Sequence, residues 1–311
     1  MNRAAAMRQY ALLLLMVPAT LAAQSTTKVY GTDINGNRIL VGERSAGEGS
    51  KTEKIETLNG RRVPVETVDE KVIEKSGGRT VIERTITRRS LDGSPLPPEK
   101  IRVEESKDES GHTTTSTTVW RGDINGRMAV TEREITESDK SGDRVQTDTR
   151  IERPGVNGSL VLSERRTAVE SGNKTANQRE EVIYSPNTNG QFVATGKETS
   201  RTYLRDGVPV TESAQYESAS SGSMQLSRQT VTETRKTASG DQELTTVYDA
   251  AAPGRSADGQ PKLREQRVID RIRTGDEITE TLSIRRASPN DSKQLGPPQR
   301  ISETVCKGKC N

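Results

Sequence analysis

The sequence predicts an all-β protein: a repeat-built antiparallel meander of long polar strands, with a two-strand repeat of about 33 residues, read from the spacing of its turns. We expect the meander to be largely single-layer and either extended or superhelically coiled. Two observations predict this fold. Turn dipeptides recur at regular intervals, and the side chains of the segments between them alternate with the two-residue period of a strand. A third is the low apolar content of 29%, which is too small to fill conventional cores.

Asn-Gly and Asp-Gly dipeptides mark one series of turns, which recurs at a nearly constant interval from Asn59-Gly60 to Asn189-Gly190. A second series of Ser-Gly dipeptides falls between them, from Ser76-Gly77 to Ser171-Gly172. Glycine suits such turns because it has no Cβ atom and adopts positive φ without strain. We therefore predict structural turn glycines at Gly60, Gly93, Gly126, Gly158 and Gly190.

The segments between turns alternate with a period of two residues. In residues 79–90, Val81 and Glu83 fall on one side, and Ile82 and Arg84 fall on the other. Both sides carry charges, whereas a strand of a β-sandwich has one consistently apolar side. Long helices are disfavoured because Gly and Asx residues interrupt the chain about every sixteen residues.

About fourteen to sixteen such strands exceed the usual limit near ten for a twisted open sheet. The sheet must therefore coil, bend or close, and the sequence leaves these alternatives open. A membrane barrel is disfavoured because it needs an apolar band with aromatic girdles, while this chain has only 3% aromatic residues. Partial disorder is a further alternative at this low apolar content, although abundant Thr, Val and Ile favour strands.

The chain divides into four predicted parts: a signal peptide (1–23), an N-terminal hairpin (24–50), a regular hairpin array (51–249), and C-terminal hairpins with Pro/Gly-rich linkers (250–311). Arg3 and Arg8 precede an apolar run at residues 11–17, and Ala22-Ala23 offers a cleavage site. We expect export to the periplasm, the cell surface or the extracellular space. A retained membrane anchor is the alternative, but the apolar run is too short to span a bilayer.

Charge excludes nucleic acid as the expected partner. The chain has 47 basic and 44 acidic residues, and the two signs are interspersed, as in Glu132-Arg133-Glu134. Nucleic-acid binding requires Lys and Arg clustered on one face.

Few residues offer chemistry. Cys306 and Cys310 lie in Cys-Lys-Gly-Lys-Cys, and in an exported chain we predict a small disulfide between them, with thiol redox reactivity as the alternative. His112, the single histidine, lies in a predicted turn and is interpreted as structural. We predict no catalytic residues, no metal site and no cofactor.

A non-enzymatic role as a structural, spacer or surface-interaction protein is therefore predicted, with an unknown protein or polysaccharide surface as partner and no membrane span after signal removal. The single polar sheet, as in residues 79–90, resembles the central sheet of spirochaete outer-surface proteins, in architecture only. The alternative is a secreted carbohydrate-binding module or hydrolase with its site in the C-terminal half. Its candidate aromatic platforms are Tyr184, Tyr203, Tyr216 and Tyr248.

Overall fold

The structure is a computed structural model that describes residues 25–32, 37–46, 51–58, 61–90, 92–123, 125–173, 175–219, 222–250, 261–288 and 294–307. The predicted signal peptide, Gly60 and Cys310 lie outside these residues. The described residues contain strands and no helix. The strands are β1 (Ser25–Thr32), β2 (Arg38–Ala46), β3 (Lys51–Leu58), β4 (Arg61–Ser76), β5 (Arg79–Arg88), β6 (Glu99–Lys107), β7 (Thr113–Gly122), β8 (Met128–Ser141), β9 (Arg144–Pro154), β10 (Leu160–Gly172), β11 (Asn177–Pro186), β12 (Phe192–Arg205), β13 (Val208–Ser218), β14 (Met224–Lys236), β15 (Gly240–Asp249), β16 (Lys262–Thr274), β17 (Glu277–Arg286) and β18 (Gln299–Lys307).

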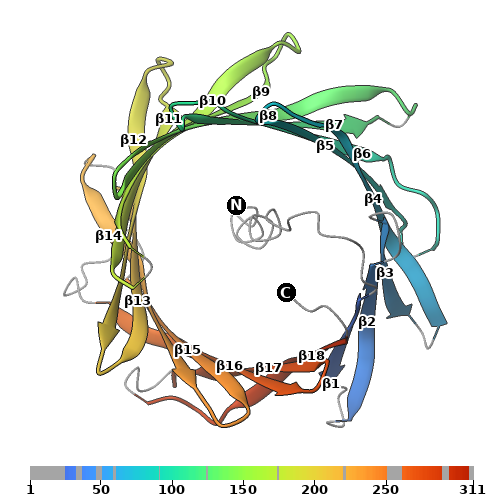
Figure 1. The fold of residues 1–311 in the computed structure, drawn as a ribbon, viewed down its shortest axis with the longest axis vertical. Helices are drawn as coiled ribbons and strands as arrows, with labels where there is room; N and C mark the ends of the chain where they lie inside the picture. Colours follow the sequence, from blue (N-terminus) through green and yellow to red (C-terminus); the bar gives the residue numbers. More distant parts are fainter. Residues whose placement is uncertain are drawn as a thin grey trace.

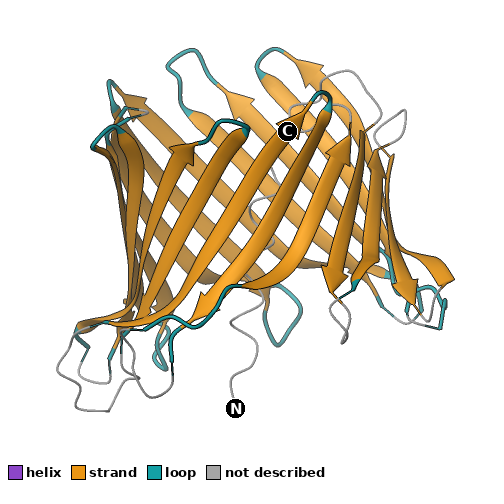
Figure 2. Cartoon of the chain, turned by 90° about the horizontal axis from the view of Figure 1, so that it is seen from below, coloured by secondary structure: helices purple, strands orange, loops and turns teal. Residues whose placement is uncertain are grey.

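These strands form a closed antiparallel barrel. Each strand pairs with the next along the chain, and β1 also pairs with β18, where Val29 faces Thr304. Figure 1 shows the resulting ring, and Figure 2 shows the strands inclined to its axis. The predicted antiparallel meander is therefore confirmed. The structure adds the closure, and its 18 strands exceed the number expected from the turns.

The two series of turns lie at opposite ends of the barrel. The Ser-Gly series belongs to the end that we call the tight-turn end, which has two-residue turns such as Gly77-Gly78 and Asp206-Gly207. The Asn-Gly series belongs to the loop end. There the same pair of backbone hydrogen bonds closes four hairpins, between Asp123 and Arg127, Gly155 and Ser159, Asn187 and Gln191, and Ala219 and Ser223. Because successive strands are antiparallel, every second turn returns to the same end.

The four hairpins just named have the hydrogen bonds of three-residue connections. Gly126 N–H donates to the Asp123 carbonyl at 2.9 Å, and Asp123 N–H donates to the Arg127 carbonyl at 2.9 Å. Gly93, Gly126, Gly158 and Gly190 have φ between 76° and 87°. Asp206 is the one non-glycine residue with positive φ among those described, so the described asparagines keep ordinary φ. This pattern is that of a type I turn followed by a glycine bulge.

The barrel wall is a single layer with almost no conventional core. The buried hydrophobic residues among those described are Val81, Ile151, Ala168, Val210 and Val247. Backbone hydrogen bonds and pairs of side chains on neighbouring strands must therefore supply most of the stability, at roughly 0.2–1 kcal/mol for each side-chain pair.

Replacing Gly158 by Val should destabilise its hairpin by about 1–3 kcal/mol, because φ there is 79° and a β-branched residue avoids that region. No atom lies within 4 Å of the Cβ position, so the cost is backbone strain alone. Hydrogen exchange should show lost protection in β9 and β10 only. The control Gly155→Ala lacks the positive φ and should leave protection unchanged. Unchanged protection in the Gly158 variant would contradict the turn geometry.

Closure predicts a cross-link between the first and last strands. In a background with both native cysteines replaced by Ser, Val29→Cys and Thr304→Cys should oxidise to a disulfide, because these residues are paired and share a face. Peptide mapping by mass spectrometry detects the link. Val29→Cys combined with Leu282→Cys, which lies one strand further away, should remain reduced. If neither pair oxidises, the ring is open.

Candidate interaction surface

The hydrogen-bond directions determine which side chains face outward. β10 runs toward the tight-turn end, with β11 on its right when the barrel is viewed from outside (Figures 1 and 2). Asn173 N–H donates to the Ala176 carbonyl, so Thr167, Val169 and Ser171 also direct their backbone polar groups toward β11. For L-residues in a strand of this direction, the side chains then point outward. The strand registers extend this assignment to the other strands, because directly paired residues on neighbouring strands point to the same face.

The inner face carries many polar and charged side chains. On β4 to β7 it also holds aliphatic side chains by the strand registers, namely Val68, Val72, Ile82, Ile86, Ile101, Val103 and Val119. Its Arg and Glu side chains pair across strands, for example Arg121 with Glu99 at 2.7 Å and Arg153 with Glu132 at 2.8 Å. Threonines also pair there. Their hydroxyl–hydroxyl distances are 2.9–3.0 Å in the pairs Thr136–Thr149, Thr202–Thr211 and Thr232–Thr245.

Glu134 is the inner carboxyl group with the most distinctive electrostatics. Desolvation by burial raises its pKa, while the nearby Arg166 guanidinium opposes that shift. Further carboxylates on the same face, from Glu132 and Glu164, raise the pKa as well. Carboxylates therefore gather around Glu134 on the inner face of β8 to β10, and Arg153 and Arg166 pair with two of them, Glu132 and Glu164.

The outer face collects the aromatic side chains. Every aromatic residue in the described part of the chain points outward by the strand registers, including the single Trp and the single Phe. They are Tyr30, Trp120, Tyr184, Phe192, Tyr203, Tyr216 and Tyr248. Aromatic residues spread evenly over the two faces would not all point outward, so the two sides of the wall differ in their aromatic content.

Most of these rings lie at one level, near the loop end. Trp120, Tyr184, Tyr216 and Tyr248 occupy equivalent positions of successive two-strand repeats, and Glu152 takes that position in the repeat after Trp120. Aliphatic residues face them across the hairpins, as Leu226 faces Tyr216 and Val130 faces Trp120. We call the following outward side chains the apolar band: Trp120, Met128, Val130, Leu160, Leu162, Tyr184, Phe192, Ala194, Tyr216, Met224, Leu226, Tyr248 and Leu263.

A repeated bulge marks the level of the apolar band. The strand registers shift at Thr131, Ser163, Thr195 and Ser227, once in each of four successive two-strand repeats. Each hydroxyl donates to a carbonyl of the preceding strand, as Ser163 Oγ does to the Ile151 carbonyl at 2.9 Å. The hydroxyl thus donates a hydrogen bond to a backbone carbonyl at the point where the strand ladder is interrupted.

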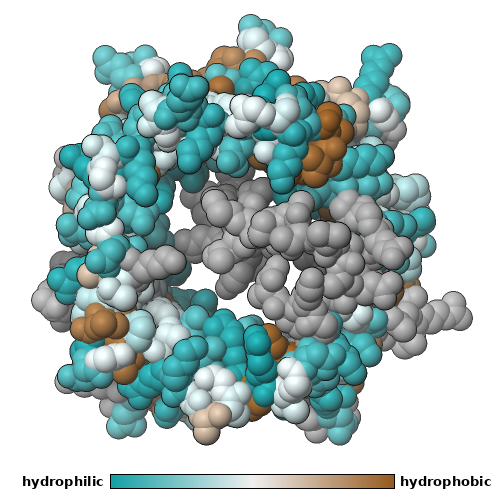
Figure 3. Space-filling view, in the orientation of Figure 1, coloured by the Kyte–Doolittle hydropathy of each residue, from teal (hydrophilic) through white to brown (hydrophobic). Residues whose placement is uncertain are grey.

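Three neighbouring hairpins lose all charge toward the loop end. Residues 154–163, 182–196 and 218–227 contain no Asp, Glu, Lys or Arg in a chain that is 29% charged. We call these segments the uncharged tips. Val156 is fully exposed, and Val161, Phe192 and Val193 are exposed as well. Figure 3, a view along the barrel axis from the tight-turn end, shows that most of the described surface at that opposite end is hydrophilic.

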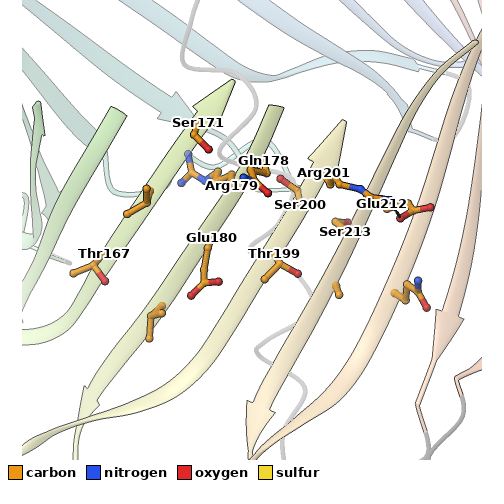
Figure 4. Close-up of a pocket in the computed structure, with 14 residues that line it drawn as sticks. Thr167, Ser171, Gln178, Arg179, Glu180, Thr199, Ser200, Arg201, Glu212 and Ser213 are labelled. Carbon is orange, nitrogen blue, oxygen red and sulfur yellow. Dashed lines mark ion pairs between the residues drawn. The ribbon is translucent and has the colours of Figure 1, made fainter. Parts of the chain in front are cut away.

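A depression of about 580 Å³ lies above this band on the outer face of β10 to β14 (Figure 4). Its rim includes Arg201 and Glu212, whose charged groups are 3.6 Å apart. Polar side chains in the lining come from Thr167, Gln178 and Thr199, which are ordinary strand residues of the wall. This site is open, its lining includes Val169, Val182 and Ala214 beside the polar side chains, and it assembles no nucleophile with a base.

The structure separates the residues that the sequence singled out. His112 lies at the tight-turn end, where its Nδ1 is 2.7 Å from Asp139 Oδ1. Cys306 is in β18, and its proposed partner Cys310 lies outside the described residues, so the disulfide stays a prediction. Tyr203 is near the tight-turn end, where it donates to Glu212 at 2.6 Å. The other three candidate tyrosines share the apolar band.

Within the described residues, no cluster of three or more His, Cys, Asp and Glu side chains could hold a metal ion. The described part of the chain also contains no helix with the length and hydropathy needed to cross a membrane. Neither a protein-family model nor a curated protein matches the chain.

The His112–Asp139 contact predicts a titration. The hydrogen bond to Asp139 raises the pKa of His112 above its ordinary value near 6.5. A raised pKa means that this contact stabilises the fold below about pH 6.5, and that the contribution is lost as pH rises through the folded-state pKa. NMR titration of the single histidine should show the raised value, and Asp139→Asn should lower it. The control Asp143→Asn should leave the pKa of His112 unchanged. Equal His112 pKa values in all three proteins would refute the contact.

Proposed function

We propose that the protein is a non-enzymatic, exported interaction protein that attaches to another surface through its apolar band. The observation that supports this is the gathering of aromatic and aliphatic outward side chains near one end of the wall. Exposed apolar patches of this kind mark sites of interaction. The closed wall would hold the band in a fixed arc between β7 and β16, which suits a structural or spacer role.

The proposed partner is a surface other than nucleic acid. Outward basic side chains of the array pair with carboxylates, as Arg165 does with Asp148 at 2.5 Å and Arg150 with Glu137 at 2.7 Å. Such pairing supports a surface without the concentrated positive charge that phosphate backbones require. Export to the periplasm, the cell surface or the medium remains part of the proposal and rests on the N-terminal sequence.

Replacing Tyr184, Tyr216 and Tyr248 together by Ala should reduce retention of the protein on envelope fragments of the producing organism at least tenfold, because the three rings lie in the apolar band. Co-sedimentation measures the retention, and circular dichroism checks that the strands persist. The matched control is Tyr203→Ala, since Tyr203 faces outward near the other end. Equal retention of the triple variant and the wild type would refute the proposal.

A secreted carbohydrate-binding module or hydrolase is the second candidate. The observation favouring it is the placement of Tyr184, Tyr216 and Tyr248 at one level on alternate strands, β11, β13 and β15. Rings in such a row offer stacking surfaces for sugars. Retention on purified peptidoglycan or insoluble polysaccharide that is lost in the triple tyrosine variant would support this candidate over a general surface role.

A further inference from the structure

We propose that the three uncharged tips enter the headgroup region of a phospholipid membrane, with the apolar band lying just behind them. This inference rests on the proposed attachment function and names its surface. It concerns the hairpins β9–β10, β11–β12 and β13–β14, whose tips are adjacent on the ring and flare outward in Figure 1.

The tips expose apolar side chains on both faces of the hairpins. Phe192 points outward and its neighbour Val193 points inward, and both are exposed. On the adjacent hairpin, Leu160 points outward while Val161 points inward with 47% of its surface exposed. A protein groove or a glycan would cover one face of a hairpin. Immersion in a lipid interface surrounds both faces at once, so a membrane suits this arrangement better.

Basic side chains lie close to the apolar band on the outer face, and Glu152, the outward acid nearest the β9–β10 tip, is paired with Arg133 at 3.8 Å. Arg150, Arg165 and Lys197 point outward just above the apolar band, each paired with a carboxylate. In all three pairs the acid lies further from the tip, because Asp148 faces Thr167 and Glu137, and Glu180 faces Thr199, in the strand register. Within these pairs, lipid phosphates would therefore meet the basic group before the acid, with the tyrosine hydroxyls at the interface level that suits them.

The strand ladders limit how deep the tips reach. Pairing between β10 and β11 begins at Arg165 and Tyr184, and pairing between β12 and β13 begins at Gly196 and Glu217. Beyond these residues, the facing edges of neighbouring hairpins form no ladder. Unpaired backbone groups are costly in hydrocarbon but are hydrated among headgroups. The tips extend roughly 12 Å past the tyrosines at ordinary strand rise and tilt, so they match an interfacial depth of about 5–10 Å.

The test measures sedimentation of the purified protein with vesicles of phosphatidylcholine containing one-fifth phosphatidylglycerol. The variant Val156→Asp/Phe192→Asp places charge on two tips at exposed sites, where the fold tolerates it. We expect its partition into vesicles to fall at least tenfold. The control Ile272→Asp changes an outward residue, 46% exposed, at the tight-turn end and should keep wild-type partition. Circular dichroism shows that all three proteins are folded.

Trp120 offers an independent readout, because it is the single tryptophan and lies in the apolar band. Vesicles with brominated lipid should quench its fluorescence in the wild type and in the Ile272 control, but not in the tip variant. Absence of wild-type partition or quenching would overturn the membrane inference. Self-association in ultracentrifugation that the tip variant abolishes, without vesicle binding, would overturn it as well and assign the tips to a second copy.

The two proposals fail separately. Retention on envelope fragments without vesicle binding would leave the attachment function intact and refute the lipid surface. Loss of both retention and vesicle binding in the wild type would refute both.

Discussion

The backbone hydrogen-bond ladder, closed between β1 and β18, is the interaction on which the rest of this structure depends. A wall one layer thick cannot rely on burial, and the buried hydrophobic set among the described residues is five small or medium side chains. An open sheet of this width would leave two exposed edges and would be free to coil. Closure removes both edges and gives every described strand two neighbours. The polar side-chain pairs then add many small contributions to an already continuous ladder.

Closure also separates the chemistry of the two sides. A strand alternates its side chains, so a ring has one face toward its axis and one toward the outside. The inner face holds charged pairs such as Arg153–Glu132 and raises the pKa of Glu134 through burial. The outer face holds the aromatic rings near the loop end. The same polar composition that prevents a conventional core thus yields two surfaces with different partners available to them.

The bulges connect the repeat to the candidate surface. At Ser163 and Ser227 the register shifts by one residue, and the hydroxyl satisfies a carbonyl of the neighbouring strand. A shift of one residue exchanges the faces of all the side chains beyond it. Without these bulges, Leu162 and Leu226 would point inward whenever the strand residues on the tight-turn side of the bulge kept their present faces. The bulges are therefore what places both leucines outward beside the aromatic rings. The apolar band therefore depends on a local irregularity that recurs once in each two-strand repeat.

The sequence by itself determined the all-β meander, the turn positions and the presence of charged residues on both sides of the strands, because Gly-containing turns and period-two alternation are local signals. Gly126 and Gly158 could be assigned to turns from their neighbours alone, although the three-residue geometry with ordinary φ at the asparagines could not. Tyr184, Tyr216 and Tyr248 could be noted as candidates, and a search at the interval of the two-strand repeat would have added Trp120. Only the tertiary structure decided that β1 meets β18 and which side chains face outward. Those outcomes depend on pairing between the first and last described strands and on register shifts at the bulges, which no local pattern encodes.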